Sequence, residues 1–207
     1  MTSKLIENTI RPDVRALASY LVPDASGYIK LDAMENPYPL PDRLRSELAM
    51  RLADAVLNRY PIPTYGTLKQ KIRANLGVPE GFDVILGNGS DEIISIIATA
   101  VARNDRRAVI MAPVPAFVMF ARTAQVVGCD FVGVPLRADF SLDREAMLAA
   151  IAQHKPAAVF LAYPNNPTGN LFDEADMEAI IEALGDNGIA VVDEAYGPFA
   201  QASFMDR

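Results

Sequence analysis

From residue 83 onward the chain alternates short apolar runs with longer stretches in which apolar residues recur at helical spacing. Apolar runs this short are typical of strands, and the stretches between them are long enough for helices. Such alternation is typical of crossover units, which build a mostly parallel sheet with helices on both faces. The sequence therefore predicts an α/β fold with a mostly parallel, mixed sheet. The expected strands are 83–86, 108–112, 131–134, 157–162 and 189–192, and the expected helices are 90–102, 115–127, 143–153 and 173–184.

The first part of the chain lacks this alternation. Prolines interrupt residues 1–41, where only residues 28–31 have the pattern of a short strand. We therefore expect an extended amino-terminal arm that lies across another domain or another subunit. Two amphipathic helices are predicted after it, at 41–57 and 66–76. Gly77 follows the second helix at the position of a C-cap.

The composition narrows the class of protein. Hydrophobic residues make up 51% of the chain and charged residues 22%, as in an ordinary soluble globular protein. The apolar stretches are too short to cross a bilayer, and polar residues near the amino terminus argue against a signal peptide. One cysteine excludes an internal disulfide framework, so we expect a cytoplasmic location. The formal net charge of −7 argues against a nucleic-acid partner.

Several common site motifs are absent from the sequence. The single histidine, His154, cannot supply a zinc ligand set, and its place near a predicted helix end favours a solvated C-terminal cap. The chain contains no Walker motif, no Gly-x-Gly-x-x-Gly motif and no Gly-x-Ser-x-Gly elbow. We therefore expect no metal site.

Polar residues gather where two of the predicted strands end. An Asn-Asn-Pro-Thr-Gly turn follows strand 157–162, and Asp193 follows strand 189–192. Ligands of open α/β sheets bind outside the carboxyl ends of the strands, so both strand ends are expected to reach one crevice. Burial there would favour the neutral form of Asp193 unless a cation faces it. That cation is either a protonated pyridine nitrogen or, in a purely structural role, a buried Lys or Arg.

Other candidate features have equally plain structural explanations. In Gly87-Asn88-Gly89-Ser90-Asp91-Glu92, Ser90 can cap a helix whose free N–H groups form an anion site, or the helix is simply well capped without a ligand. Of the two phenylalanines at helical spacing, Phe120 is expected in the core, whereas Phe117 is either core or a cofactor platform. Tyr60 is either a surface tyrosine in a turn or a functional residue.

Six segments taken together are more specific than any one of them. They are Met34-Glu35-Asn36-Pro37, Asn58-Arg59-Tyr60-Pro61, Gly89-Ser90-Asp91-Glu92, Pro115-Ala116-Phe117-Val118-Met119-Phe120, Asn165-Asn166-Pro167-Thr168-Gly169 and Asp193-Glu194-Ala195-Tyr196. In this order they resemble the histidinol-phosphate aminotransferase family, among the fold-type-I aminotransferases that use pyridoxal phosphate. The resemblance implies that residues 42–207 form an incomplete cofactor-binding large domain, and that residues 1–41 form the arm and part of the small domain.

The resemblance also implies a role for each matching residue. Asp193 would pair with the pyridinium nitrogen of pyridoxal phosphate, which keeps the ring an electron sink. The ring's phenolic oxygen would accept hydrogen bonds from Asn166 and Tyr196, and Phe117 would stack on the ring face. Further residues implied are Gly89, Ser90 and Asp91 at the cofactor phosphate, Tyr60 reaching the partner subunit's phosphate in a homodimer with shared active sites, and Glu35 and Asn36 on the substrate side.

The sequence departs from the family pattern at three points. Met34 stands where the family usually has Asn, and Phe117 stands where a tyrosine is common, so stacking is kept and a hydroxyl is lost. The Schiff-base lysine of the family is expected beyond Arg207, so we expect no catalytic residue within this chain. The lysines present, Lys4, Lys30, Lys69, Lys71 and Lys155, lie in other sequence contexts.

The implied activity is transfer of an amino group between glutamate and a small phosphorylated amine, histidinol phosphate being the expected substrate. Three alternatives stay open. The same cofactor residues would serve a threonine-phosphate decarboxylase or another class I/II aminotransferase. A truncated, non-catalytic dimerisation module is the alternative from a different class.

Overall fold

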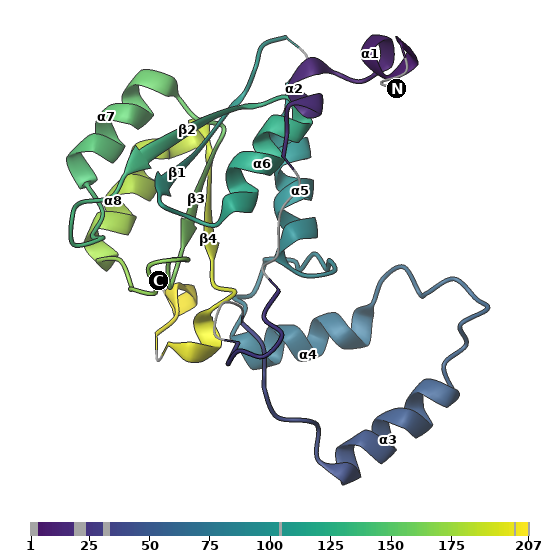
Figure 1. Cartoon of the computed structure of the whole chain (residues 1–207). Helices are drawn as coiled ribbons and strands as arrows, with labels where there is room; N and C mark the ends of the chain where they lie inside the picture. Colours follow the sequence, from purple (N-terminus) through teal and green to yellow (C-terminus); the bar gives the residue numbers. More distant parts are fainter. Residues whose placement is uncertain (1–3, 19–23, 31–33, 104, 201, 207) are drawn as a thin grey trace. The chain divides into compact units, whose positions relative to one another are not determined.

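The computed structural model of the chain describes residues 4–18, 24–30, 34–103, 105–200 and 202–206. These residues fall into two compact units (Figure 1). We call the described residues within 1–20 and 85–207 the sheet unit, and those within 21–84 the helix-pair unit. The two units differ in how much apolar surface each one buries.

Among the described residues, four strands form one sheet in the order β2-β1-β3-β4, and all three pairings are parallel. Helices connect successive strands, as the alternation in the sequence predicts. The strand order reverses between β1 and β3, so this sheet has a topological switch point at that pair.

The strands are β1 (Val109–Val114), β2 (Asp130–Pro135), β3 (Ala158–Ala162) and β4 (Ile189–Asp193). The helices of the sheet unit are α1 (Lys4–Thr9), α2 (Pro12–Arg15), α5 (Ser90–Val101), α6 (Val118–Val127), α7 (Arg144–His154) and α8 (Glu174–Leu184), with 3-10 turns η1 (Gly185–Asn187), η2 (Gly197–Phe199) and η3 (Phe204–Asp206).

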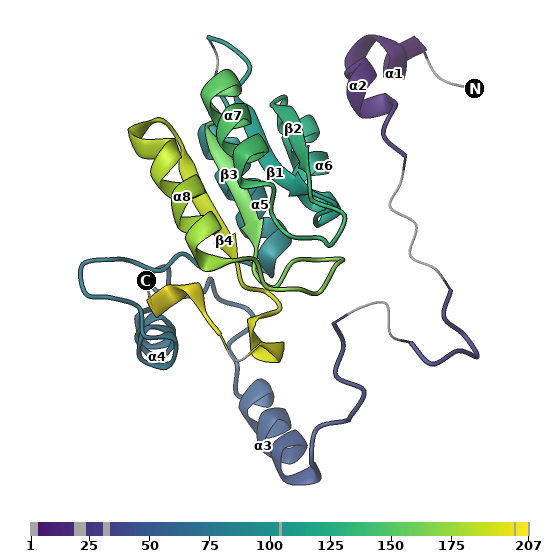
Figure 2. The same ribbon diagram turned by 90° about the vertical axis from the view of Figure 1, so that its left-hand side faces the viewer.

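Each face of the sheet carries its own core. Figure 1 shows α7 and α8 on one face and α5 and α6 on the other, and Figure 2 shows the α7 and α8 face in front of the strands. Side chains of β3 alternate between the two, because successive residues of a strand point to opposite faces. Val159 and Leu161 pack in the α7 and α8 core, whereas Phe160 packs in the α5 and α6 core. The buried apolar run of the sequence is thus a strand covered on both sides.

The predicted helices and strands from residue 90 onward are confirmed, with small shifts at their ends. The helix predicted at 115–127 begins only at Val118, because residues 115–117 form the loop that follows β1. Phe117 is therefore the N-cap residue of α6. His154 is the last residue of α7, the helix end predicted for it.

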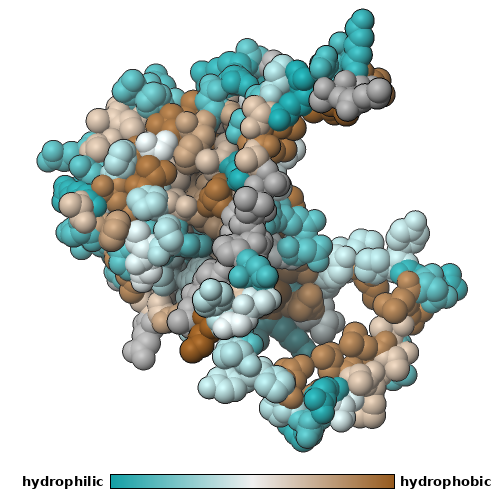
Figure 3. Space-filling model, in the orientation of Figure 1, coloured by the Kyte–Doolittle hydropathy of each residue, from teal (hydrophilic) through white to brown (hydrophobic). Residues whose placement is uncertain are grey.

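The helix-pair unit contains α3 (Asp42–Ala53) and α4 (Gly66–Leu76), both predicted from the sequence. Gly77 caps α4 with a φ of 65°, in the left-handed region that glycine adopts without steric cost. No residue of either helix is buried. The apolar side chains at helical spacing on α3, such as Leu48, remain about half exposed, and Figure 3 shows hydrophobic residues at the surface in this region. The unit thus has amphipathic helices without a core of its own.

Two predicted strands do not form. Residues 83–86 pair with no other strand among the described residues, and Ile85 is 63% exposed. The Asp83 carboxylate instead accepts a hydrogen bond from the amide of Val84. Residues 28–30 likewise lie outside any strand, and Tyr28 closes a turn by donating its N–H to the carbonyl of Ala25. Leu31, the last residue of that prediction, lies outside the described residues. An apolar run forms a strand only where a neighbouring strand pairs with it, and within the described part of the chain these runs have no such neighbour.

None of the described helices is both long and apolar enough to cross a membrane.

Candidate functional site

The loops that follow β1, β3 and β4 meet at the carboxyl edge of the parallel sheet. β3 and β4 are paired in a register that places Ala162 beside Asp193, and the amide of Tyr163 donates to the Asp193 carbonyl at 2.8 Å. β1 and β3 flank the switch point, and the loops after them lie at the edge where sheets of this kind bind ligands. The predicted meeting of polar strand ends at one edge is therefore present.

Asp193 is a partly buried carboxylate at the end of β4. Burial raises the pKa of Asp193, the hydrogen bond from the Ala195 amide at 3.0 Å lowers it, and the negative charge of Asp91 raises it. No Lys, Arg or His among the described residues forms a salt bridge with Asp193. The sequence left open that a buried Lys or Arg pairs with Asp193 in a purely structural role. The described residues contain no such partner.

The start of α5 lies at the same edge of the sheet as Asp193. Asp91 lies in the first turn of α5, and its charge is among the causes that raise the pKa of Asp193. The packing agrees with this, since Ile94 in the first half of α5 lies in the same core as Ala162 of β3, with Val191 of β4 packed against it. The glycine-rich start of α5 and the end of β4 therefore face one region of the sheet unit.

Ser90 does not cap α5, contrary to the prediction. Gly89 is the N-cap, with a φ of 81°, and Ser90 is the first helical residue. The backbone conformation at this position favours glycine, so the cap moves one residue toward the amino terminus. No side chain caps the helix at the N-cap; the Glu92 carboxylate instead accepts from the amide of Asn88. The first N–H groups of a helix have no partner within it, and at α5 they lie on the edge where Asp193 is found.

Asn166 and Tyr196 form a polar pair between two of the loops. The side-chain nitrogen of Asn166 lies 3.5 Å from the Tyr196 hydroxyl, and both side chains are half-buried. The β3 and β4 register explains this proximity, since each residue follows shortly after the paired residues Ala162 and Asp193. Two groups able to donate hydrogen bonds thus stand together near a carboxylate that lacks a basic partner in the described chain.

Phe117 lies at the rim of the aromatic core. Phe120 is buried and stacks on Phe160 with ring centroids 4.7 Å apart, which confirms its predicted place in the core. Phe117 meets Phe120 edge to face at 5.8 Å and remains half-buried. Its backbone is fixed as the N-cap of α6. An aromatic ring with part of its surface still free is therefore held at the carboxyl edge by the core behind it.

The remaining predicted residues belong to the helix-pair unit. Glu35 pairs with Lys30 at 2.6 Å, and the Asn36 side chain accepts from the Tyr38 amide at 3.0 Å in a local turn. Tyr60 is 98% exposed. These contacts all lie within the helix-pair unit, so the roles of the three residues stay predictions.

Polar contacts that the sequence did not reveal hold the loops in place. Asn165, in the loop after β3, donates from its side chain to the Pro115 carbonyl at 3.1 Å. After β4, the Glu194 carboxylate accepts from the Ser203 hydroxyl at 2.8 Å. The polar residue types at positions 165 and 194 were the only indication of these contacts in the sequence. Pro115 lies 50 positions from Asn165, and Ser203 lies 9 positions from Glu194.

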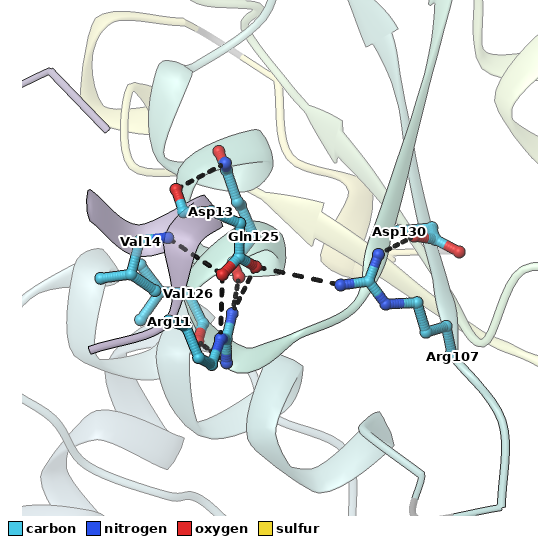
Figure 4. Close-up of polar contacts among 7 residues, drawn as sticks. All are labelled: Arg11, Asp13, Val14, Arg107, Gln125, Val126 and Asp130. Atoms are coloured by element: carbon cyan, nitrogen blue, oxygen red, sulfur yellow. Dashed lines mark hydrogen bonds and ion pairs between the residues drawn. The ribbon is translucent and has the colours of Figure 1, made fainter. Parts of the chain in front are cut away.

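The amino-terminal segment is attached to the end of α6 that is opposite Phe117. Arg11 donates to the carbonyls of Gln125 at 2.8 Å and Val126 at 3.1 Å, and it also pairs with Asp13 (Figure 4). The hydrogen bond from Arg11 lowers the pKa of Asp13. A cation is favourable at this place, because the carboxyl end of a helix carries the negative end of the helix dipole. Residues far apart in the sequence thus become one part of the sheet unit.

The carboxyl edge combines features that suit one kind of ligand. A carboxylate suits a protonated ring nitrogen, a hydroxyl and an amide suit a polar ring substituent, and a half-buried phenyl ring suits an aromatic face. Free amides at a helix start suit an anionic group. Among the described residues, no group of three or more His, Cys, Asp or Glu side chains is arranged to hold a metal ion.

Comparisons with known proteins identify relatives of this chain. Residues 26–206 match the family described as aminotransferase class I and II. The chain is 62% identical over 206 residues to Histidinol-phosphate aminotransferase 2 of Cupriavidus pinatubonensis, covering 98% of this chain and 56% of that protein. It is 60% identical to Histidinol-phosphate aminotransferase 1 of Ralstonia nicotianae, covering 98% and 54%.

Solved structures agree with this result. The crystal structure of histidinol-phosphate aminotransferase from Sinorhizobium meliloti in complex with pyridoxal-5'-phosphate superimposes with a TM-score of 0.74 at 25% identity, covering 93% of this chain and 52% of that one. A putative histidinol-phosphate aminotransferase from Erwinia carotovora atroseptica gives a TM-score of 0.73 at 26% identity, covering 91% and 54%. The chain spans about half the length of the curated relatives it matches.

Proposed function

The chain belongs to the class I and II aminotransferase family, and from this premise we propose that it is the amino-terminal portion of a pyridoxal-phosphate-dependent histidinol-phosphate aminotransferase. The proposed reaction transfers the amino group of histidinol phosphate reversibly to 2-oxoglutarate, which gives imidazole-acetol phosphate and glutamate. The names of relatives that are 60–62% identical support this substrate. The predicted fold-type-I large domain agrees with the fold of the structural neighbours.

Asp193 carries the cofactor proposal. Its pKa is raised by burial, and no basic side chain of the described chain pairs with it. A positively charged pyridine nitrogen supplies the missing countercharge, so the carboxylate and the proton on the ring stabilise each other. When bound, pyridoxal phosphate supplies an electron-withdrawing ring for chemistry at the substrate Cα.

The other residues of the carboxyl edge fit the rest of the cofactor. Asn166 and Tyr196 would donate hydrogen bonds to the phenolic oxygen of the ring, and Phe117 would stack on its face. The amides of Gly89, Ser90 and Asp91 hold the phosphate at the start of α5. The Asp91 carboxylate has the same charge sign as a phosphate, so its backbone N–H is the binding group.

The protein is proposed to act as a homodimer with shared active sites. Tyr60 is almost fully exposed, which leaves its hydroxyl free to reach the phosphate of the cofactor in the other subunit. We assign Glu35 and Asn36 to the side of the phosphorylated substrate. The uncovered apolar side chains of α3 are consistent with burial against further protein.

An assay of the full-length protein tests the activity. We expect glutamate to form from histidinol phosphate and 2-oxoglutarate, and no carbon dioxide to be released from threonine phosphate. Asp193→Ala is expected to lower kcat/KM by roughly 10²–10³-fold, the size expected when a group that stabilises developing charge is lost. Asp186→Ala, at an exposed aspartate of η1, is the matched control. Decarboxylation without amino transfer would replace the proposal with the alternative activity.

Chain 1–207 alone gives a second test. We expect weak, non-covalent binding of pyridoxal phosphate and no useful turnover, because the Schiff-base lysine is predicted beyond Arg207. Absorption spectra before and after borohydride reduction, followed by peptide mass mapping, measure this. A reduced adduct at one particular lysine of residues 1–207 would show that the predicted lysine is wrongly placed.

The shared active site is tested by mixing subunits. Tyr60→Phe and Asp193→Ala impair different halves of one proposed site. Mixed dimers therefore contain one site with both residues intact, and we expect part of the lost activity to return when the two variants are refolded together. Mixtures no more active than the separate variants would contradict a site that spans two subunits.

A further inference from the structure

One buried side chain joins the loops on both sides of the switch point. Asn165 follows β3 and is 2% exposed. Its side-chain nitrogen donates to the Pro115 carbonyl in the loop after β1 at 3.1 Å, and to the Thr168 hydroxyl at 2.7 Å. The first bond connects residues 50 positions apart in the sequence. Asn165 therefore fixes the separation of two loops that belong to different crossover units.

The hydrogen-bond partners of Asn165 determine the orientation of its side-chain amide. A backbone carbonyl such as that of Pro115 only accepts hydrogen bonds, so the group that faces it must be the NH₂ of Asn165. The side-chain oxygen of Asn165 is buried and has no hydrogen-bond partner in the described structure. The polar contacts of this side chain within the described residues are therefore made by its NH₂ group, and a residue without an amide would lose them.

The loop that Asn165 begins is closed by further hydrogen bonds. The Thr168 hydroxyl donates to the side-chain oxygen of Asn170, whose NH₂ donates to the Phe140 carbonyl at 3.0 Å. The backbone of Asn165 is also bonded to Asn170 at 2.9 Å and to Gly169 at 2.8 Å. These bonds hold residues 165–170 in one arrangement, so we expect a change at Asn165 to alter the position of Asn166 as well.

Two of the proposed cofactor residues are adjacent to the ends of the Asn165–Pro115 bond. Phe117 lies two residues after Pro115, and Asn166 directly follows Asn165 and approaches Tyr196 at 3.5 Å. We propose that Asn165 is a positioning residue whose amide sets the stacking ring of Phe117 and the donor group of Asn166 at the separation that orients the cofactor ring. This inference rests on the proposed function, because it assigns Asn165 a role toward pyridoxal phosphate.

The test compares two variants of the full-length protein. Asn165→Ala removes the amide, and Asn165→Asp keeps its shape but replaces the NH₂ donor by an acceptor oxygen. Asn187→Ala and Asn187→Asp, at an exposed asparagine of η1, are the matched controls. Equilibrium dialysis gives the dissociation constant for pyridoxal phosphate, visible circular dichroism reports the fixed orientation of the bound ring, and amide hydrogen exchange follows both loops in the cofactor-free protein.

We expect both Asn165 variants to bind pyridoxal phosphate roughly tenfold more weakly, the effect of losing one or two buried hydrogen bonds. The dichroism of the remaining bound cofactor should shrink, and exchange should speed up in residues 115–117 together with 165–170. The Asn187 variants should match the wild type in all three measurements. If Asn165→Asp behaves like the wild type, the donor role is overturned.

A double variant separates positioning from general loosening. If Asn165 acts partly by placing Phe117, the loss of cofactor affinity in Asn165→Ala should be smaller when Phe117 is already alanine. Losses that simply multiply would show that the two residues act independently and would overturn the proposed coupling.

Two further outcomes keep this inference distinct from the proposed function. If the wild type does not bind pyridoxal phosphate, the proposed function fails and the cofactor role of Asn165 fails with it. If the wild type binds and the Asn165 variants bind equally well, only the positioning role is overturned. Should both Asn165 variants fail to fold, Thr168→Val removes one partner of the amide at a half-buried site. Unchanged dichroism and exchange in that variant would also overturn the proposal.

Discussion

The sheet unit and the helix-pair unit both contain apolar residues at regular spacing, but only the sheet unit buries them in a core. Every residue of β3 is buried between two helical layers, whereas α3 and α4 contain no buried residue. Both regions have clear periodic patterns in the sequence, so pattern alone does not tell whether an apolar face is covered. The difference depends on whether neighbouring elements of the same unit pack against that face.

This difference divides the proposed site into two kinds of residue. Asp193 ends β4, and Asn166 and Phe117 lie on loops that leave the packed sheet, so the backbones of all three are held by the core behind them. Tyr60 lies on an exposed segment with no such support. Groups that must be held accurately are best placed on rigid elements, and the ring of the proposed cofactor is the part that would need this accuracy.

The largest expected effect contrasts two phenylalanines, one from each unit. Phe160 is fully buried and stacked on Phe120, whereas Phe82 is 68% exposed. Phe160→Ala should lower the free energy of unfolding by about 3–5 kcal/mol through the cavity it leaves. Phe82→Ala should change it by about 0.5 kcal/mol or less. Urea denaturation measures both, and a comparable loss in the two variants would mean that the helix-pair unit is packed more closely than its exposure indicates.

The next effect concerns the charge of Asp193 in the cofactor-free protein. Since burial raises the folded-state pKa of Asp193, its ionised form destabilises the folded state near neutral pH. Asp193→Asn should therefore be more stable than the wild type at pH 7, while binding pyridoxal phosphate more weakly. As the pH falls through the raised pKa, the folded wild type takes up a proton first and the advantage of the variant should shrink.

Urea denaturation at several pH values between 7 and 4 checks this sign. Asp186→Asn is the control, because Asp186 is exposed. An advantage of Asp193→Asn that grows toward acid pH would contradict a raised pKa. Lower stability of the variant at pH 7 would indicate that a cation pairs with Asp193 in the full-length protein.

The smallest expected effect is local and lies at the amino-terminal attachment of Figure 4. Arg11→Ala removes the donor to the Gln125 and Val126 carbonyls, so the amide hydrogens of α2 should exchange faster. Global unfolding should change little, because the core of the sheet does not contain Arg11. Arg15→Ala, at an exposed arginine of the same helix, is the control. Equal acceleration in both variants would show that the Arg11 contacts do not hold the segment.

Much of the sheet unit could be predicted because its signals are local. Apolar runs such as the one that became β3 need burial on both faces, and helical spacing between such runs indicates the crossovers. The run at 83–86 has the same local appearance and failed, because a strand also requires a partner. At Ser90 the residue type favoured a cap, but the backbone conformation at Gly89 decided where the helix begins.

The sequence by itself determined the α/β alternation, the polar ends of the strands and the six segments that resemble the aminotransferase family. These features follow from residue chemistry and short-range periodicity, which each segment carries with it. Only the tertiary structure decided that the charge of Asp91 acts on Asp193, and that Asn165 bonds to Pro115. Both depend on the order of the strands, in which β1 and β3 lie side by side although β2 separates them along the chain.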